Sequence, residues 1–248
     1  MTPFSFFRGT SHKDNSEELS RLILPVNKQI KAWHKANRRM KWGINEEAIE
    51  CIEPPPALTE EDRNQDFIGV ILFYGFGDDG SGNADPVLSG KVAWEYAVKS
   101  KRGKTWQCEY IDFNRSDDIR LRPGAPVRPK GFYFAKFQPG GRFQSSTVSH
   151  VRKNLGKATG CGPEGIQLLA ITHRHFQTLM NEGKIPFMAL ADYDVAPYGY
   201  GDFFDAMQLF HSVGVFGLGI GNVDRNYPLF GIPTILLHSG AKADEKKD

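Results

Sequence analysis

Residues 185–191 form an apolar run of strand length that ends abruptly in Asp192-Tyr193-Asp194. Pro197-Tyr198-Gly199 follows and predicts a turn just beyond the strand. Side chains two residues apart lie on the same face of a strand, so we expect both carboxylates to point to one spot. Open α/β sheets place their sites at the carboxyl ends of their strands. The pattern therefore predicts a buried strand that presents Asp192 and Asp194 at the edge of a sheet.

Two adjacent negative charges repel each other, and a divalent cation relieves this repulsion. Hard carboxylate oxygens at this spacing suit Mg²⁺ or Mn²⁺, held against the phosphates of a substrate. We therefore assign Asp192 and Asp194 as candidate metal ligands and catalytic residues. In the alternative, one aspartate caps the following turn and the other forms a surface salt bridge.

After residue 145, predicted helices alternate with short apolar strands. We expect helices at 147–156, 173–182 and 202–212, and strands at 166–172, 187–191, 215–220 and 233–238. This alternation is typical of βαβ units with parallel strand pairing. The second half of the chain is therefore predicted to consist of βαβ units.

The pattern is different between residues 67 and 137. Strands are expected at 67–74 and 132–137. Alternating apolar residues over 92–110 predict a β-hairpin, with a helix over 85–100 as the competing interpretation. The predicted fold class is therefore α/β or α+β. Its mixed sheet would have an antiparallel meander in the first half and βαβ units in the second.

The chain before residue 67 has its own organisation. Residues 16–42 predict one helix, or two that are broken near Pro25, and a short helix over 45–52 follows. Three consecutive prolines and a cluster of acids are typical of an extended linker. The expected organisation is an N-terminal helical extension (1–52), a linker (53–66), an α/β core domain (67–240) and a disordered tail (241–248).

One face of the predicted N-terminal helix is basic. Its residues are Lys28, Lys31, Lys35, Arg38 and Arg39, and no acidic residue lies between Lys28 and Lys41. Such a face can bind the phosphate backbone of a nucleic acid, with Trp33 or Trp42 stacking on a base. In the alternative, the opposite apolar face packs on the body of the protein and the basic side chains are solvated.

The stretch 185–200 resembles the Toprim domain, and within it the A subunits of type IIB topoisomerases and their relatives. In these proteins a strand that ends in Asp-x-Asp runs into Pro-Tyr-Gly, as Asp192-Tyr193-Asp194 and Pro197-Tyr198-Gly199 do here after two extra residues. The resemblance implies Mg²⁺ binding and phosphoryl transfer on nucleic acid. The family pattern also has a glutamate that ends an earlier strand, whereas Glu164 here precedes its predicted strand.

A strand followed by Asp-x-Asp is also similar to the metal motif of GT-A glycosyltransferases. These enzymes bind nucleotide sugars, so this resemblance implies a nucleotide-sugar transferase. Both resemblances rest on the same short stretch around Asp192 and Asp194.

His173 and His175 follow the predicted strand at 166–172. If the strands are parallel, both histidines lie on the same edge as Asp192, where either could serve as a general base or a metal ligand. We therefore include them as candidate catalytic residues, with a structural role at the start of a helix as the alternative.

Cysteine and glycine positions add two further candidates. Cys161 lies between two glycines, which predicts either an accessible thiol nucleophile or a small residue in a tight turn. The glycines of 217–221 could wrap a phosphate with backbone N–H groups, or they could let a strand pack closely.

Composition limits the compartment and the class of partner. The formal net charge of +2 does not by itself require nucleic acid or a membrane as a partner. Three scattered cysteines, Cys51, Cys108 and Cys161, indicate a reduced, cytoplasmic environment and not a disulfide framework. The start of the chain lacks the pattern of a secretory signal, and no apolar stretch is long enough to predict a membrane span.

We therefore expect a divalent-metal-dependent protein that acts on or binds a phosphate-containing substrate, with nucleic acid favoured. A nucleotide-sugar transferase is the alternative enzyme. A different alternative is a non-enzymatic interaction module that binds a protein partner or a second copy of itself. Its aromatic surface would consist of Tyr193, Tyr198, Tyr200, Phe203 and Phe204.

Overall fold

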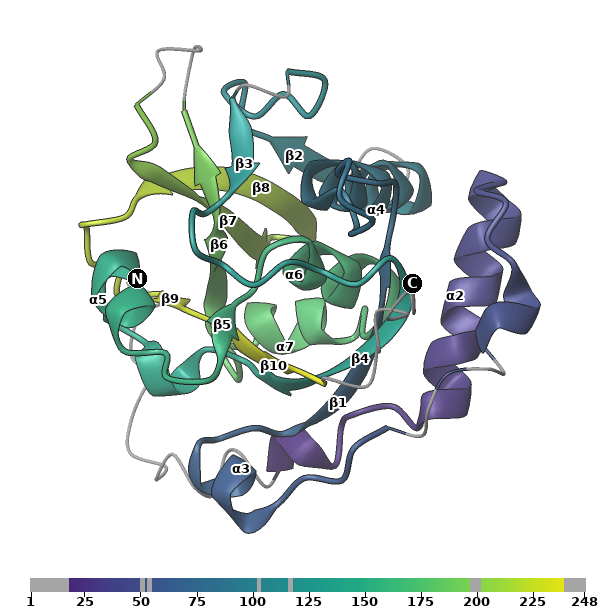
Figure 1. Cartoon of the computed structure of the whole chain (residues 1–248). Helices are drawn as coiled ribbons and strands as arrows, with labels where there is room; N and C mark the ends of the chain where they lie inside the picture. Colours follow the sequence, from purple (N-terminus) through teal and green to yellow (C-terminus); the bar gives the residue numbers. More distant parts are fainter. Residues whose placement is uncertain are drawn as a thin grey trace, which may run out of the picture.

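The structure, a computed structural model, describes residues 18–49, 52, 55–101, 104–115, 118–196 and 202–238. Cys51, the predicted turn at Pro197-Tyr198-Gly199 and the tail 241–248 lie outside the described residues. Two sheets enclose a group of helices, and further helices lie on the outside (Figure 1). The helical segments are α2 (Val26–Met40), η1 (Glu46–Ile49), α3 (Glu60–Asn64), α4 (Pro86–Lys101), η2 (Gly141–Phe143), α5 (Val148–Lys153), α6 (Pro163–Gln167), η3 (Leu168–Thr172) and α7 (Phe176–Asn181).

The strands form a four-stranded and a six-stranded sheet. The smaller sheet has the order β1-β4-β10-β5 and is antiparallel throughout. The larger sheet has the order β2-β8-β7-β6-β3, and β9 pairs with β6. The strands are β1 (Gly69–Gly75), β2 (Thr105–Gln107), β3 (Ile119–Leu121), β4 (Gly131–Gln138), β5 (Thr159–Gly160), β6 (Phe187–Val195), β7 (Asp205–Ser212), β8 (Val215–Asn222), β9 (Phe230–Gly231) and β10 (Thr234–Leu237).

Helices combined with mixed sheets confirm the predicted α/β or α+β class. The prediction of βαβ units in the second half is wrong, because β6, β7 and β8 are consecutive antiparallel neighbours. Parallel pairing is present only between β2 and β8 and between β6 and β9 among the described strands. The antiparallel part of the fold therefore extends well beyond the first half.

The predicted helix at 202–212 is in fact strand β7. Its side chains alternate between the two faces of the sheet, with Met207 and Leu209 buried in the core. Val213 and Gly214 both have positive φ, at 49° and 78°, and join β7 to β8 as a two-residue hairpin loop. Such loops match the twist of antiparallel strands, so the turn at Gly214 fixes a hairpin here.

The predicted strand at 166–172 is also wrong, since these residues continue from α6 into the π-helix η3. All residues of both segments are buried. A short apolar run that is buried on every side has no periodicity that separates a strand from a helix. Pro163, which begins α6, was the available signal, because proline favours the first position of a helix.

Helix α4 replaces the first strand of the predicted hairpin, as the competing interpretation proposed. Asp85 begins this helix: its carboxylate accepts a hydrogen bond from the backbone N–H of Leu88 at 3.0 Å. The buried residues Ser89, Ala93 and Ala97 recur every four positions, which is a helical spacing. Only the second half of the predicted hairpin is extended, as the short strand β2.

The helices α4, α6 and α7 fill the space between the two sheets (Figure 1). Trp94 of α4 packs on Phe216 of β8 with ring centroids 5.4 Å apart. On the other side, η3 lies against β1. The two sheets approach each other at β5 and β6, where the backbone N–H of Asp192 donates to the carbonyl of Cys161. Residue Asp192 therefore lies where the two sheets join.

The N-terminal helical segment breaks at Pro25, which confirms one of the two predicted forms. Helix α2 packs beside β1, the edge strand of the smaller sheet. The Gln29 side chain donates to the carbonyl of Val70 and accepts from the N–H of Leu72, and Trp33 donates to the carbonyl of Leu72. These side chains satisfy backbone groups that an edge strand otherwise leaves open.

The short helix expected over 45–52 is a 3₁₀ turn at η1, and the predicted linker contains the helix α3. The predicted strands at 67–74, 132–137, 215–220 and 233–238 and the helix at 147–156 are confirmed as β1, β4, β8, β10 and α5. Across the described ranges, no helix is long and apolar enough to cross a membrane.

Candidate functional site

Asp192 and Asp194 both lie near the end of β6, as predicted, on a segment that departs from regular pairing. Strand β6 pairs with β7 up to Leu190 and again at Val195, with a register shift between them. The Arg152 guanidinium of α5 donates to the carbonyls of Ala191 and Tyr193 in this interval, at 2.7 and 3.2 Å. This side chain therefore supplies hydrogen bonds to carbonyls of β6 where its pairing with β7 is interrupted.

The Asp192 carboxylate is fully buried and is held by two arginines and a threonine. Its Oδ2 accepts from Arg128 Nη2 at 2.8 Å and from the Thr159 hydroxyl. Its Oδ1 lies 3.2 Å from Arg122 Nη2. Both oxygens are therefore engaged with cationic side chains.

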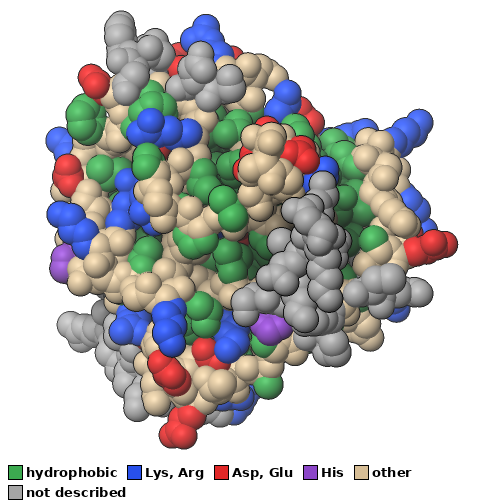
Figure 2. Space-filling view, in the orientation of Figure 1, with side chains coloured by type: hydrophobic (Ala, Val, Ile, Leu, Met, Phe, Trp, Pro, Cys, Tyr) green, Lys and Arg blue, Asp and Glu red, His purple; other side chains and the backbone are tan. Residues whose placement is uncertain are grey.

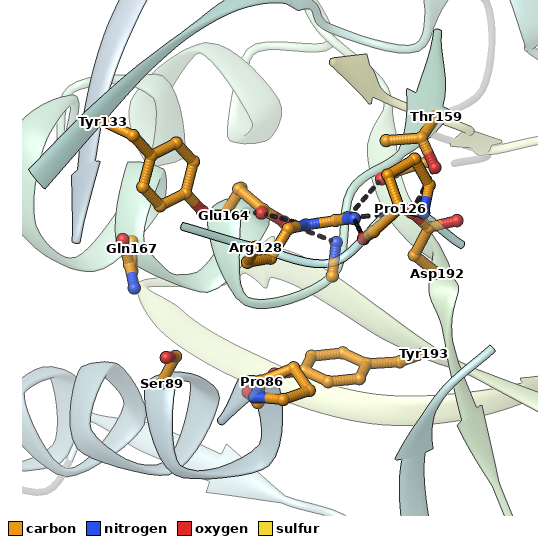
Figure 3. A network of polar contacts seen from close by, with 12 residues as sticks. Pro86, Ser89, Pro126, Arg128, Tyr133, Thr159, Glu164, Gln167, Asp192 and Tyr193 are labelled. Carbon is orange, nitrogen blue, oxygen red and sulfur yellow. Dashed lines mark hydrogen bonds and ion pairs between the residues drawn. The ribbon is translucent and has the colours of Figure 1, made fainter. Parts of the chain in front are cut away.

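Arg128 links Asp192 to a second buried carboxylate (Figure 3). Its Nε donates to Glu164 Oε1 at 2.6 Å, and the Tyr133 hydroxyl donates to the same oxygen at 2.8 Å. Burial opposes the charge of Arg128, but Glu164 and Asp192 outweigh this and raise the pKa of the guanidinium. Burial, and then the charge of Glu164, raise the pKa of Tyr133 well above its usual value. The guanidinium is thus a cation between two carboxylates.

Asp194 has a different pair of arginines. Its Oδ1 lies 2.8 Å from Arg152 Nη2, and its Oδ2 lies 3.7 Å from Arg120 Nε. Burial lowers the pKa of Arg152, although Asp194 favours its charged form. Arg120 is 46% exposed, and its guanidinium lies over the Phe203 ring at 3.6 Å from the centroid. The charge of Asp194 is therefore balanced at the rim of the buried network.

Four arginines thus neutralise the three carboxylates of this region. A cation at Asp192 and Asp194 would take the places that these guanidinium groups hold, so Arg122 and Arg128 would have to leave Asp192 first. In the part of the chain that the structure describes, no group of three or more His, Cys, Asp or Glu side chains could hold a metal. The alternative expected one aspartate to cap the turn and the other to form a surface salt bridge, whereas both aspartates form salt bridges that are mostly buried. Metal binding stays a prediction.

His173 and His175 do not lie beside Asp192, since the segment before them is a helix. His173 Nε2 accepts from the backbone N–H of Leu24 at 3.0 Å, and its Nδ1 contacts the Thr172 hydroxyl. Burial, together with His175, lowers the pKa of His173 to about 3. His175 Nε2 donates to the carbonyl of Leu22, 3.0 Å away. Both histidines therefore hold the segment before α2 against the core.

Cys161 and the glycines at 217–221 follow the structural alternatives. Cys161 is completely buried, and burial raises the pKa of its thiol well above the usual value, so it is not an accessible nucleophile. The glycines lie within strand β8. A Cβ at Gly217 would collide with the Phe210 ring, and one at Gly221 would collide with the Gln208 side chain. These glycines therefore let neighbouring side chains lie close to the backbone.

The predicted basic face is present on α2. All five of its basic side chains are exposed, whereas Gln29, Trp33, Ala36 and Asn37 are buried on the opposite face. In Figure 2, Lys and Arg side chains gather along the edge where Figure 1 places α2. The basic residues are Lys28, Lys31, Lys35, Arg38 and Arg39.

The aromatic residues of the predicted interaction surface do not form one patch in the described chain. Tyr193 is completely buried, and its hydroxyl donates to the carbonyl of Pro86. Phe203 lies under Arg120, and Phe204 is 59% exposed. Tyr198 and Tyr200 lie outside the described residues. Because Tyr193 is buried, it cannot contribute to the expected interaction surface.

The arginines were missed from the sequence, as was the role of Glu164. Arg128 lies in a proline-rich segment, Pro123 to Lys130, with no periodic pattern around it. An isolated arginine in such a segment is normally a solvated residue. The available signal was the pair of adjacent aspartates, which requires a positive charge without specifying that arginine supplies it.

No family model, curated protein or solved structure matches this chain.

Proposed function

We propose that this protein binds nucleic acid through the exposed basic face of α2. The observation that carries the proposal is the placement of Lys28, Lys31, Lys35, Arg38 and Arg39 on the solvent side of one helix. Phosphate groups attract such a row, and release of their counterions supplies most of the affinity. The proposal identifies nucleic acid as the phosphate-containing ligand.

The spacing of these residues suits an extended polyanion. From Lys28 to Arg39 the helix rises by about 16 Å, at roughly 1.5 Å per residue. Their positions advance by three or four residues, or by one at Arg38-Arg39, so they occupy one side of the helix. A linear array of positive charge can follow several successive phosphates, whereas a compact cluster would favour a single anion.

In the part of the chain that the structure describes, no carboxylate is paired with these side chains. None of the five forms an ion pair with an acidic residue among those described, and α2 itself contains no acid. Glu46, which is close to the helix, lies 3.4 Å from His34 and accepts from Asn37. Among the described residues, phosphates would therefore not have to displace a carboxylate from these five side chains.

Helix α2 is held firmly in place. Trp33 is completely buried and packs on Tyr74 and Phe132, with ring centroids 6.0 and 5.8 Å apart. Gln29 and Trp33 also bond to the edge of β1. Binding would therefore require little ordering of the backbone, which favours affinity.

Arg39 extends the basic surface to α4. Its Nη2 donates to the carbonyl of Lys99 at 2.6 Å, and Lys99 Nζ donates to the carbonyl of Arg39 at 3.2 Å. Both side chains are exposed. Lys99 therefore adds a positive charge where α2 and α4 meet.

The Toprim-like stretch favours nucleic acid over other phosphate-containing ligands, and a cytoplasmic location is part of the proposal. Metal-dependent phosphoryl transfer at Asp192 and Asp194 is a separate hypothesis, because it requires the arginine pairs to open. A nucleotide-sugar transferase would bind a nucleoside diphosphate with Mn²⁺ and ignore DNA. An interaction module would respond to neither a metal nor phosphate.

The test compares two triple variants of the full chain. Lys31→Gln, Lys35→Gln and Arg38→Gln together remove charge from α2. The matched control changes Arg63, Lys153 and Lys157, which are exposed basic residues on other elements, to Gln. Affinity for a labelled DNA oligonucleotide is measured by fluorescence anisotropy.

The α2 variant should lose at least roughly 10-fold in affinity at low salt, and the control should lose much less. Equal losses in the two variants, or no binding by the unmodified protein, would contradict the proposal. Circular dichroism confirms that both variants are folded.

A further inference from the structure

An aromatic row crosses the larger sheet on one face. Trp106 of β2 is in register with Gly217 of β8, which is in register with Phe210 of β7. Met188 pairs with Leu209, so Phe187 of β6 comes beside Phe210, and Phe187 pairs with Phe230 of β9. We call Trp106, Phe210, Phe187 and Phe230 the aromatic row.

The rings of the aromatic row contact one another in sequence. The ring centroids of Trp106 and Phe210 are 5.7 Å apart, and those of Phe210 and Phe187 are 6.2 Å apart. Phe187 and Phe230 follow at 5.4 Å. Tyr227 extends the series beyond Phe230, with centroids 6.0 Å apart. Aromatic side chains thus form a continuous band across five strands.

Glycines of β8 let the rings of this band lie close to the strand backbone. The Phe210 ring lies so close to Gly217 that a Cβ there would collide with it. A Cβ at Gly219 would lie within 3.8 Å of both Phe210 and Trp106. Because Gly217 and Gly219 have no side chains, the Phe210 and Trp106 rings can pack directly on the backbone of β8.

The aromatic row is open to solvent, most of all at Trp106. Trp106 is 50% exposed, and the phenylalanines of the row are half-buried. Helix α5 covers a neighbouring part of the same face, where Val148 and Val151 pack with Ala189 and Ala206. That part has small side chains under a helix, whereas none of the described helices covers the large rings of the row.

The charge around the aromatic row is favourable for a polyanion. Lys104, which is exposed, lies two residues before Trp106 in the chain. No acidic residue lies on this face of β7 or β8. The positions on this face are every second residue from Ala206 to Ser212 and from Val215 to Gly221. Lys99, near the end of α4, shortly precedes Lys104 in the sequence. Its backbone carbonyl and side chain contact Arg39 of the basic face of α2.

We propose that the aromatic row stacks the bases of a single-stranded nucleic acid. This inference rests on the proposed function and adds that the ligand is single-stranded. Every base has a flat π-face, so a row of rings on a sheet binds successive bases with little dependence on sequence. In a duplex these base faces are covered by neighbouring base pairs, so the aromatic row can contribute only when the bases are unpaired.

The test uses the full chain with labelled oligothymidine and with a DNA hairpin duplex of equal charge. Trp106→Ala removes the most exposed ring of the aromatic row, and Trp106→Phe keeps a ring there. Phe204→Ala is the matched control, because Phe204 is another highly exposed aromatic residue, outside the row. The α2 triple variant is measured in parallel.

Trp106→Ala should weaken oligothymidine binding by roughly 10-fold and leave duplex binding unchanged, while Trp106→Phe retains most of the affinity. The α2 variant should weaken both ligands. If Trp106→Ala matches the unmodified protein on oligothymidine while the α2 variant is weakened, stacking is wrong and the proposed function stands.

If the α2 variant is also unaffected, the proposed function fails as well. Sedimentation of the protein without DNA shows whether it forms a dimer. A dimer that Trp106→Ala dissociates would show that the row is an interface between two copies and would overturn base stacking.

Discussion

Arg128 and Asp192 form a buried ion pair, with Nη2 and Oδ2 2.8 Å apart and both side chains almost completely removed from solvent. Removing one partner of such a pair leaves an uncompensated buried charge, at a cost of about 3–5 kcal/mol. Asp192→Asn should therefore lower the free energy of unfolding by about 3 kcal/mol, measured by urea denaturation.

Asp194→Asn is the comparison for that variant, because one of its partners, Arg120, is 46% exposed. Asp194→Asn should lower the free energy of unfolding by less than Asp192→Asn does. Since arginines already neutralise both carboxylates, Mg²⁺ or Mn²⁺ should leave the melting temperature of the unmodified protein unchanged. A metal-dependent rise that Asp192→Asn abolishes would instead support the metal hypothesis.

A second prediction concerns the open edge of β1. Gln29→Ala would leave the carbonyl of Val70 and the N–H of Leu72 without their side-chain partner. An unsatisfied buried polar group costs about 1–3 kcal/mol, so we expect a loss of roughly 3 kcal/mol in the free energy of unfolding. Gln65→Ala is the control, because Gln65 makes only an exposed contact with Glu61, and it should change stability very little.

The pH dependence of stability tests the environment of His173. Its pKa in the folded protein is about 3, against an ordinary value of 6.5, because burial and His175 disfavour the charge. The unfolded chain therefore binds the extra proton between these values, and stability falls as pH decreases from about 6.5. The slope for one such group is at most about 1.4 kcal/mol per pH unit.

His173→Gln provides the reference, because its amide oxygen can still accept from the N–H of Leu24. The stability of the unmodified protein relative to this variant should be constant above pH 7 and decrease steadily from pH 6 to pH 4. A difference that does not change with pH would show that the histidine is not held neutral.

Close packing over β8 gives another prediction. Gly217→Ala would force the Phe210 ring away from the strand and should destabilise the protein by about 1–3 kcal/mol. Gly141→Ala is the control, because a Cβ at Gly141 meets no atom within 4 Å and its φ is not positive. Thermal denaturation of the two variants decides whether contact with Phe210, and not the loss of a glycine, causes the effect.

Local patterns in the sequence predicted some of this structure well. The strands at 67–74 and before Asp192 are continuous apolar runs bounded by turn residues, and the basic face of α2 has a helical periodicity, so each signal belongs to the segment itself. An apolar run that is buried on every side, as at 166–172, does not by itself distinguish a helix from a strand. There the starting residue Pro163 carried more information than the apolar run.

Contacts between distant residues were not predictable in the same way. Arg128 and Glu164 are 36 positions apart, and Arg122 and Asp192 are 70 apart. Spacing within one strand shows that two carboxylates need a counter-charge, but the fold decides whether a metal or an arginine supplies it. The aromatic row has the same origin, since Trp106 and Phe210 meet only through the register of β2, β8 and β7.

The salt dependence of single-stranded DNA binding tests most directly whether phosphates bind the basic face of α2. The slope of log K against log salt concentration is about −0.7 for each phosphate contact with a single strand. Changing Lys31, Lys35 and Arg38 to Gln should therefore make the slope shallower by about 2, while the Arg63, Lys153 and Lys157 control keeps the original slope. An identical slope for the α2 variant and the unmodified protein would show that phosphates do not bind this face.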